Sequence, residues 1–152
     1  MITIYTDGSS RGNPGPGGWA AIILDEKIVK EIGGKEEHTT NNRMELMGAI
    51  KAIESISDET IIYTDSEYVM KGITEWVHNW QRKNWKTAAK KPVLNQDLWQ
   101  KLLDVCEGKN IKWKYVAGHA GVHLNERADT IATSFADGLT PRLYNGPKEK
   151  YK

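Results

Sequence analysis

Four carboxylic acids stand where folding could gather them at one place: Asp7, Glu45, Asp65 and Asp129. Asp7 and Asp65 each follow a short apolar run, ITIYT or TIIYT, that is typical of a β-strand. In open α/β sheets, ligand sites gather at the carboxyl ends of strands. Glu45 lies in the first turn of a predicted helix, and Asp129 lies near the start of another. We therefore expect all four near the boundary between core and solvent.

Each acid also has an ordinary structural explanation. An aspartate after a strand often serves a turn, and a glutamate in a first helical turn complements the helix dipole. Four clustered carboxylates, however, would raise one another's pKa unless a cation lay among them. Mg²⁺ prefers a few carboxylates together with water and substrate phosphate. Two such ions, about 3.5–4 Å apart, perform in-line phosphoryl displacement. The set therefore favours metal-dependent phosphodiester chemistry.

Alternating apolar runs and glycine-containing turns predict the strands that position these acids. The predicted strands are residues 2–6, 19–24, 28–32, 60–64 and 111–116. Glycine and proline predict irregular structure between the first two, and helices are expected between the later ones. The order predicts an α/β protein with a five-stranded mixed sheet, three antiparallel strands followed by parallel ones, flanked by helices.

Two turn signals divide the helical region. Ser66 is expected to cap a short helix that ends near Gly72, and a second helical piece follows. Asn95 is expected to cap the next helix. A last helix carries Ala128 and Ile131 on its apolar stripe and ends near residue 138.

The composition indicates one ordinary globular domain. The chain has 152 residues, of which 39% are hydrophobic, and its net charge is +1. The opening MITIYTDG lacks the pattern of a signal peptide, and no apolar stretch approaches membrane-spanning length. The single cysteine, Cys106, excludes an internal disulfide framework and lies on an apolar helical stripe. We expect a cytoplasmic protein without a membrane partner.

Five segments resemble the motifs of bacterial type I ribonuclease H, in the same order over residues 2–137. They read TDGSSRGNPGPGGW, TTNNRMEL, TDSEYV, WVHNWQRKNWKTAAKKPVLNQDLW and GHAGVHLNERAD. The resemblance implies the ribonuclease H-like fold and a catalytic domain over residues 1–138, with a basic protrusion at about 78–92. It also implies hydrolysis of the RNA strand of RNA–DNA hybrids, dependence on Mg²⁺ with Mn²⁺ as a substitute, and a monomer. Residues 139–152 have no match and are expected to form a loosely held tail.

The resemblance also assigns roles to the acids. Asp7 would bridge two metal ions, Glu45 and Asp65 would complete one metal site, and Asp129 would hold the other metal. Two-metal in-line hydrolysis would leave 5′-phosphate and 3′-hydroxyl ends.

His119, in a glycine-rich loop, matches a family histidine that assists proton transfer or product release, a role suited to a pKa near neutrality. Without the resemblance it would be an ordinary loop histidine. A zinc site with His123 is disfavoured, because Gly121 lies between the two and Cys106 is remote.

The resemblance further predicts a surface that reads the hybrid. The 2′-hydroxyl is the main difference between RNA and DNA. Residues expected to contact the sugars, bases, phosphates or DNA channel are Ser10, Asn13, Thr40, Asn41, Asn42, Tyr68, Trp76, Trp85, Lys86, Lys90 and Lys91. The alternatives are helix capping for Thr39–Asn42 and core packing for the tryptophans. Packing is favoured for Trp80 and stays open for Trp99.

Two positions depart from the family pattern. Glu67 stands where glutamine is usual, and Ala117 stands where lysine is usual, which puts substrate affinity in question but not the chemistry. A hybrid-binding module without activity is the main alternative function. A nuclease or strand-transferase of this fold acting on DNA is another.

Overall fold

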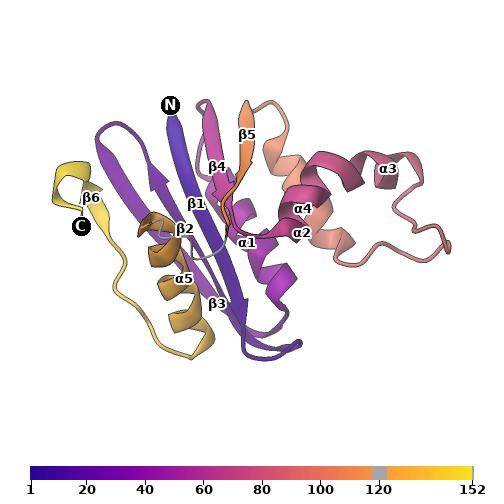
Figure 1. The fold of residues 1–152 in the computed structure, drawn as a ribbon, viewed down its shortest axis with the longest axis horizontal. Coiled ribbons are helices and arrows are strands. Elements are labelled where there is room, and N and C mark those ends of the chain that lie inside the picture. The colour runs from indigo at the N-terminus through magenta and orange to yellow at the C-terminus, as the bar shows by residue number, and fades with distance from the viewer. Residues whose placement is uncertain (118–122, 152) are drawn as a thin grey trace.

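One six-stranded mixed sheet forms the centre of the computed structural model, which describes residues 1–117 and 123–151. The strand order is β5-β4-β1-β2-β3-β6 (Figure 1). The strands are β1 (Ile2–Ser10), β2 (Gly15–Leu24), β3 (Ile28–Thr39), β4 (Thr60–Thr64), β5 (Ile111–Tyr115) and β6 (Asn145–Pro147). β1, β2, β3 and β6 pair antiparallel in turn, and β4 and β5 are parallel to β1. The predicted α/β class and strand directions are confirmed, but the predicted count of five strands was one too low.

Helices cover both faces of the sheet. They are α1 (Asn41–Glu54), α2 (Glu67–Lys71), the π-helical η1 (Gly72–Trp76), α3 (Val77–Arg82), α4 (Gln96–Cys106), α5 (His123–Ala136) and the 3₁₀-helical η2 (Lys148–Lys150). Side chains alternate along β2, so Ala21 packs with α1 and α4, whereas Ala20 and Ile22 pack with α5. In Figure 1, α5 therefore lies across the sheet from α1. Among the described residues, no helix combines the length and the apolar character needed to cross a membrane.

The strands extend into the segment that was predicted to be irregular. β1 continues to Ser10 and β2 begins at Gly15. Glycine in a strand often marks a place where another backbone comes close. A Cβ at Gly18 would overlap the Ala132 carbonyl of α5. Gly18 therefore allows α5 to approach the sheet. The prediction of irregular structure was wrong for residues 8–10 and 15–18 and is confirmed for residues 11–14.

The two predicted helix boundaries have different outcomes. The short helix capped by Ser66 is confirmed, because the Ser66 hydroxyl accepts from the Val69 N–H and α2 ends at Lys71 with Gly72 at its C-cap. The second predicted helical piece, η1 and α3, continues from Gly72 without a break. A Cβ on that glycine would overlap the Trp99 indole, so it provides close packing. Asn95 has a left-handed backbone, and its side chain makes no cap hydrogen bond. It donates instead to the hydroxyl of Tyr68.

The C-terminal tail supplies the additional strand. β6 pairs with the outer edge of β3, and Tyr144 and Tyr151 pack against the core beneath α5. The backbone N–H of Tyr144 and the hydroxyl of Tyr151 both donate to Glu31 of β3. The expected loosely held tail is thus attached to the sheet, through partners that lie more than 100 residues away in sequence.

Candidate metal and nucleic-acid site

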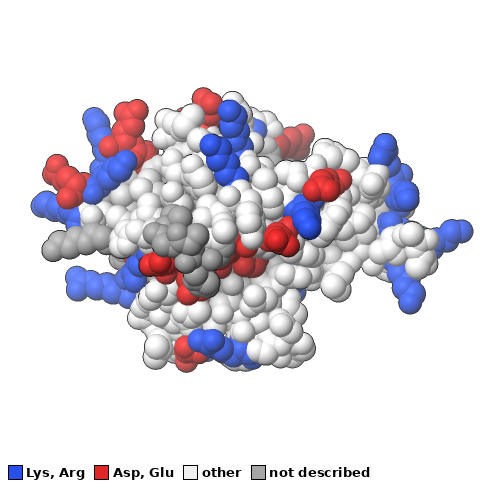
Figure 2. Space-filling view, in the orientation of Figure 1, with Lys and Arg blue, Asp and Glu red and all other residues white. Residues whose placement is uncertain are grey.

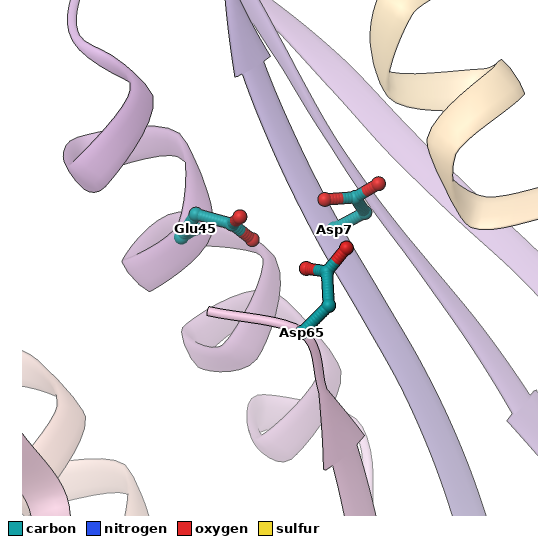
Figure 3. A group of neighbouring side chains, drawn as sticks. All are labelled: Asp7, Glu45 and Asp65. Carbon is teal, nitrogen blue, oxygen red and sulfur yellow. The ribbon is translucent and has the colours of Figure 1, made fainter. Parts of the chain in front are cut away.

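Two of the predicted acids meet where the parallel pairing of β1 with β4 ends. The strands are parallel, and their last paired residues are Thr6 and Thr64. Asp7 and Asp65 come next in register, so their carboxylates lie side by side (Figure 3). The predicted proximity of these two acids follows directly from strand direction.

Glu45 reaches the same place from α1. A Cβ on Gly8 would overlap the backbone N of Glu45, so α1 can approach β1 only because that position lacks a side chain. One carboxylate oxygen from each of Asp7, Glu45 and Asp65 lies within 4.8 Å of the others (Figure 3). Asp7 and Glu45 are buried, and Asp65 is half-buried.

Asp129, the fourth predicted acid, lies in α5 on the opposite face of the sheet. Its preceding residue, Ala128, is fully buried against β2 and β3. Asp129 is half-buried and interacts electrostatically with Asp7. The structure thus groups three acids tightly and places the fourth beside one of them.

The site is electrostatically strained as a group of bare acids. Burial, then the charge of Asp65 and, to a smaller extent, Asp129 together raise the pKa of Asp7 to about 8. Burial and the charge of Asp7 raise the pKa of Glu45 well above its ordinary value. Among the described residues, none donates a hydrogen bond to Asp7 Oδ2 or Glu45 Oε1. Buried oxygens that lack donors fit a hard divalent cation.

Hydrogen bonds link residues predicted to contact sugars, Ser10 and Asn13, with Asn41, which was predicted to contact base edges. Asn41 Oδ1 accepts from the Ser10 backbone N–H at 2.8 Å, and Asn13 Oδ1 accepts from the Asn41 N–H at 2.9 Å. Thr40 caps α1 by accepting from the Arg43 N–H. Of the four residues considered for capping, Thr40 therefore performs that role. The side chains of Asn13, Asn41 and Asn42 are exposed.

An aromatic cluster leads from the site toward the basic segment. Tyr68 contacts Trp76 and Trp99, and Trp80 contacts Trp76, Trp85 and Trp99. Trp99 is fully buried, so packing is its structural role, and Trp80 also packs against the core. Tyr68, Trp76 and Trp85 are half-buried.

The basic residues lie at the far end of this cluster. α3 and the loop after it extend away from the sheet (Figure 1), and Lys and Arg side chains gather there (Figure 2). Lys86, Lys90 and Lys91 are exposed. The backbone of Lys86 forms an isolated antiparallel β-bridge with that of Pro92. The lysines are thus open to solvent at the position predicted for the protrusion.

The remaining predicted residues have simpler outcomes. His119 lies outside the described residues. His123 begins α5 and is exposed, and Glu67 and Ala117 are exposed as well. Burial raises the pKa of the Cys106 thiol to about 11, which makes it a poor nucleophile.

Sequence reasoning missed the residues that hold Tyr68 and α1 together. Arg43 forms a two-bond ion pair with Asp97 and also donates to Asn95, which in turn donates to Tyr68. Arg43 and Asn95 are 52 residues apart, so no periodic signal joins them. The only signal is that Arg43 lies within TTNNRMEL.

Comparison with known sequences gives one consistent answer. Residues 1–137 match the RNase H family. A ribonuclease H of Pseudomonas fluorescens is 51% identical over 148 residues, covering 96% of this chain and 97% of the relative. A ribonuclease H of a Cyanothece species is 54% identical over 145 residues, covering 92% of each chain.

Solved structures agree with this match. LC9-RNase H1, described as a type 1 RNase H with the type 2 active-site motif, aligns with a TM-score of 0.82 and 30% identity, over 95% of this chain and 77% of that one. LC11-RNase H1, solved in complex with an RNA/DNA hybrid, aligns with a TM-score of 0.66 and 25% identity, over 91% and 98% of the two chains.

Proposed function

This chain belongs to the ribonuclease H family, whose members are nucleic-acid hydrolases, and we propose that it cuts the RNA strand of RNA–DNA hybrids internally by two-metal-ion in-line hydrolysis. The products are 5′-phosphate and 3′-hydroxyl ends. The observation that carries the proposal is the group of Asp7, Glu45 and Asp65 within 4.8 Å, two of them buried. Binding a polyanion alone needs no such negative cluster.

The position of each acid would determine which metal ion it binds. Asp7 is central because it neighbours the other three. It would serve both cations, with Glu45 and Asp65 completing one site and Asp129 the other. Two Mg²⁺ ions, or Mn²⁺ in their place, supply charge that promotes ionisation of water and stabilises the leaving 3′ oxygen. His119 would assist proton transfer or product release.

The protein would act as a monomer, and residues around the acids would recognise the hybrid. Ser10 and Asn13, together with Glu45, face the RNA 2′-hydroxyls, and Asn41 and Asn42 reach base edges. The hydrogen bonds that join Ser10, Asn13 and Asn41 support this role, because a preorganised loop loses little entropy on binding.

The DNA strand would follow the aromatic cluster. Tyr68, Trp76 and Trp85 line its path, and Thr40 contributes a phosphate contact. The exposed Lys86, Lys90 and Lys91 bind phosphates further along. Such contacts are independent of sequence and sensitive to salt.

A labelled RNA–DNA hybrid with Mg²⁺ tests the proposal, with duplex DNA, duplex RNA and EDTA as controls. We expect cleavage of the hybrid's RNA strand only, and none in EDTA. Glu45→Gln should still bind the hybrid without cutting it. No cleavage by the folded wild-type protein in Mg²⁺ or Mn²⁺ would leave the inactive binding module. Cleavage of duplex DNA would indicate a DNA-acting relative of this fold.

A further inference from the structure

A buried carboxylate on β3, outside the group of acids described above, accepts four hydrogen bonds. Glu31 accepts two from the guanidinium of Arg127, at 2.8 and 3.0 Å. The hydroxyl of Tyr151 donates at 2.6 Å, and the backbone N–H of Tyr144 donates at 2.8 Å. The Glu31 side chain is 1% exposed. A buried charge that is fully satisfied in this way holds its partners in one geometry.

Arg127 joins this network to the C-terminal tail and to α5. Its guanidinium also donates to the backbone carbonyl of Arg142, so it contacts β3 and the tail together. A bidentate guanidinium–carboxylate pair specifies orientation as well as distance. The start of α5 is therefore tied to the outer part of the sheet.

Three consecutive α5 residues face three directions. Successive residues of an α-helix are about 100° apart, so Arg127 and Asp129 project from opposite flanks of the buried Ala128. Arg127 points toward Glu31 on β3, and Asp129 interacts with Asp7 on β1. A rotation or slide of α5 that broke the first contact would move Asp129 relative to Asp7.

We propose that Arg127, held by Glu31 and Tyr151, is a positioning residue that sets Asp129 against Asp7, so that the C-terminal tail controls the site's affinity for divalent cations. This inference rests on the proposed function, because it takes Asp129 to be a metal ligand. Partners behind metal ligands typically change metal affinity when they are removed. Here the partner acts through the helix rather than through a direct hydrogen bond to the ligand.

The test is a Mg²⁺ titration of melting temperature, which reports cation binding without requiring cleavage. Tyr151→Phe removes one hydrogen-bond donor to Glu31. Arg127→Lys keeps the positive charge but loses the bidentate pair with Glu31. Each should raise the half-saturating Mg²⁺ concentration, by as much as about tenfold. KM for the hybrid at saturating Mg²⁺ should stay unchanged, because no substrate-contacting residue is altered.

A control lies in an ion pair outside the network and the acidic site. The Lys101 ammonium of α4 lies 3.8 Å from the Glu54 carboxylate of α1, in a partly exposed contact. Lys101→Gln should leave the half-saturating Mg²⁺ concentration unchanged. The proposal is overturned if Tyr151→Phe and Arg127→Lys fold and melt lower but bind Mg²⁺ as the wild type does. It is also overturned if Lys101→Gln weakens binding equally.

Failure of the proposed function gives a different result. In that case the wild type would show neither a Mg²⁺-dependent melting shift nor cleavage of the hybrid. A normal wild-type response with unaltered variants would reject only the positioning role.

Discussion

Asp7 lies beside Asp65 where the parallel pairing of β1 with β4 ends, and burial together with the Asp65 charge raises the pKa of Asp7 to about 8. In the unfolded chain the same group titrates near 3.8. Between these values the folded state holds a proton that the unfolded state has lost. Stability therefore falls as pH rises through this window.

The first prediction concerns this pH dependence in EDTA. The free energy of unfolding of the wild type should fall from pH 4 to 8, with a contribution from Asp7 of at most about 1.4 kcal/mol per pH unit. Asp7→Asn should show a shallower fall and be the more stable protein at pH 8. Urea denaturation at several pH values measures both. Parallel curves for the two proteins would contradict the carboxylate-repulsion argument.

The second prediction concerns the same variant with metal present. Asp7→Asn should lose hybrid cleavage by more than about 100-fold, since even residues behind a metal ligand contribute about 10–100-fold. Its melting temperature should respond less to Mg²⁺ than that of the wild type. Single-turnover cleavage and thermal melting measure these effects. A full Mg²⁺ response in the variant would remove Asp7 from the metal site.

The third prediction concerns the basic protrusion. Changing Lys86, Lys90 and Lys91 to Ala should weaken binding to all hybrid sequences alike and reduce the salt slope of log K by as much as about 2–3. Fluorescence anisotropy with two unrelated hybrids at several salt concentrations measures both. Loss of affinity for one sequence only would argue for base contacts.

A matched charge change controls for net charge in that experiment. Lys27, Lys30 and Lys148 are exposed. Lys30 pairs with Asn145 of β6, and the Lys148 N–H donates to the Lys27 carbonyl, so all three lie near β6. In Figure 1, β6 lies at the opposite end of the molecule from α3. Their triple Ala variant has the same net charge and should bind hybrids much as the wild type does.

The fourth prediction concerns the approach of α1 to β1. Gly8→Ala should destabilise the fold strongly, by about 1–3 kcal/mol or more, because the new methyl group overlaps helix backbone at Glu45. It should also weaken Mg²⁺ binding. Gly108→Ala is the control: its Cβ would meet nothing within 4 Å, but the backbone φ of +75° makes about 1–2 kcal/mol of strain. Equal Mg²⁺ affinity in both variants would contradict the role assigned to this contact.

The fifth prediction concerns the contribution of the Tyr68 hydroxyl to packing and stability. Its hydroxyl accepts from the fully buried Trp99 indole at 2.9 Å and from Asn95 at 3.1 Å. Tyr68→Phe should cost about 1–3 kcal/mol, because a buried N–H is left without an acceptor. Tyr63→Phe is a suitable control, since that half-buried ring stacks on Tyr5 and does not contact Trp99 in the aromatic cluster. Similar losses in chemical denaturation would show that Trp99 finds another partner.

The sequence by itself determined the features that depend on local spacing. Short apolar runs predicted the strands that lead to Asp7 and Asp65, although β1 continues to Ser10. Parallel pairing of β1 with β4 then placed those acids together. The motif order predicted the family, which the match over residues 1–137 confirms. Glycine predicted irregular structure wrongly where it served close packing, as at Gly18 of β2 beside Ala132. The sequence does not distinguish a glycine in a turn from a glycine in a close packing contact, because the packing neighbour is distant in sequence.

Only the tertiary structure decided the contacts made across long separations. The bond from Tyr151 to Glu31 spans 120 residues, and the pair of Arg127 with Glu31 spans 96. The raised pKa of Asp7 likewise depends on burial and on neighbours from other strands and helices. Periodicity reports which face a residue occupies, whereas hydrogen bonding and desolvation depend on what the fold brings to that face. That physical difference left the tail's attachment and its link to α5 invisible in the sequence.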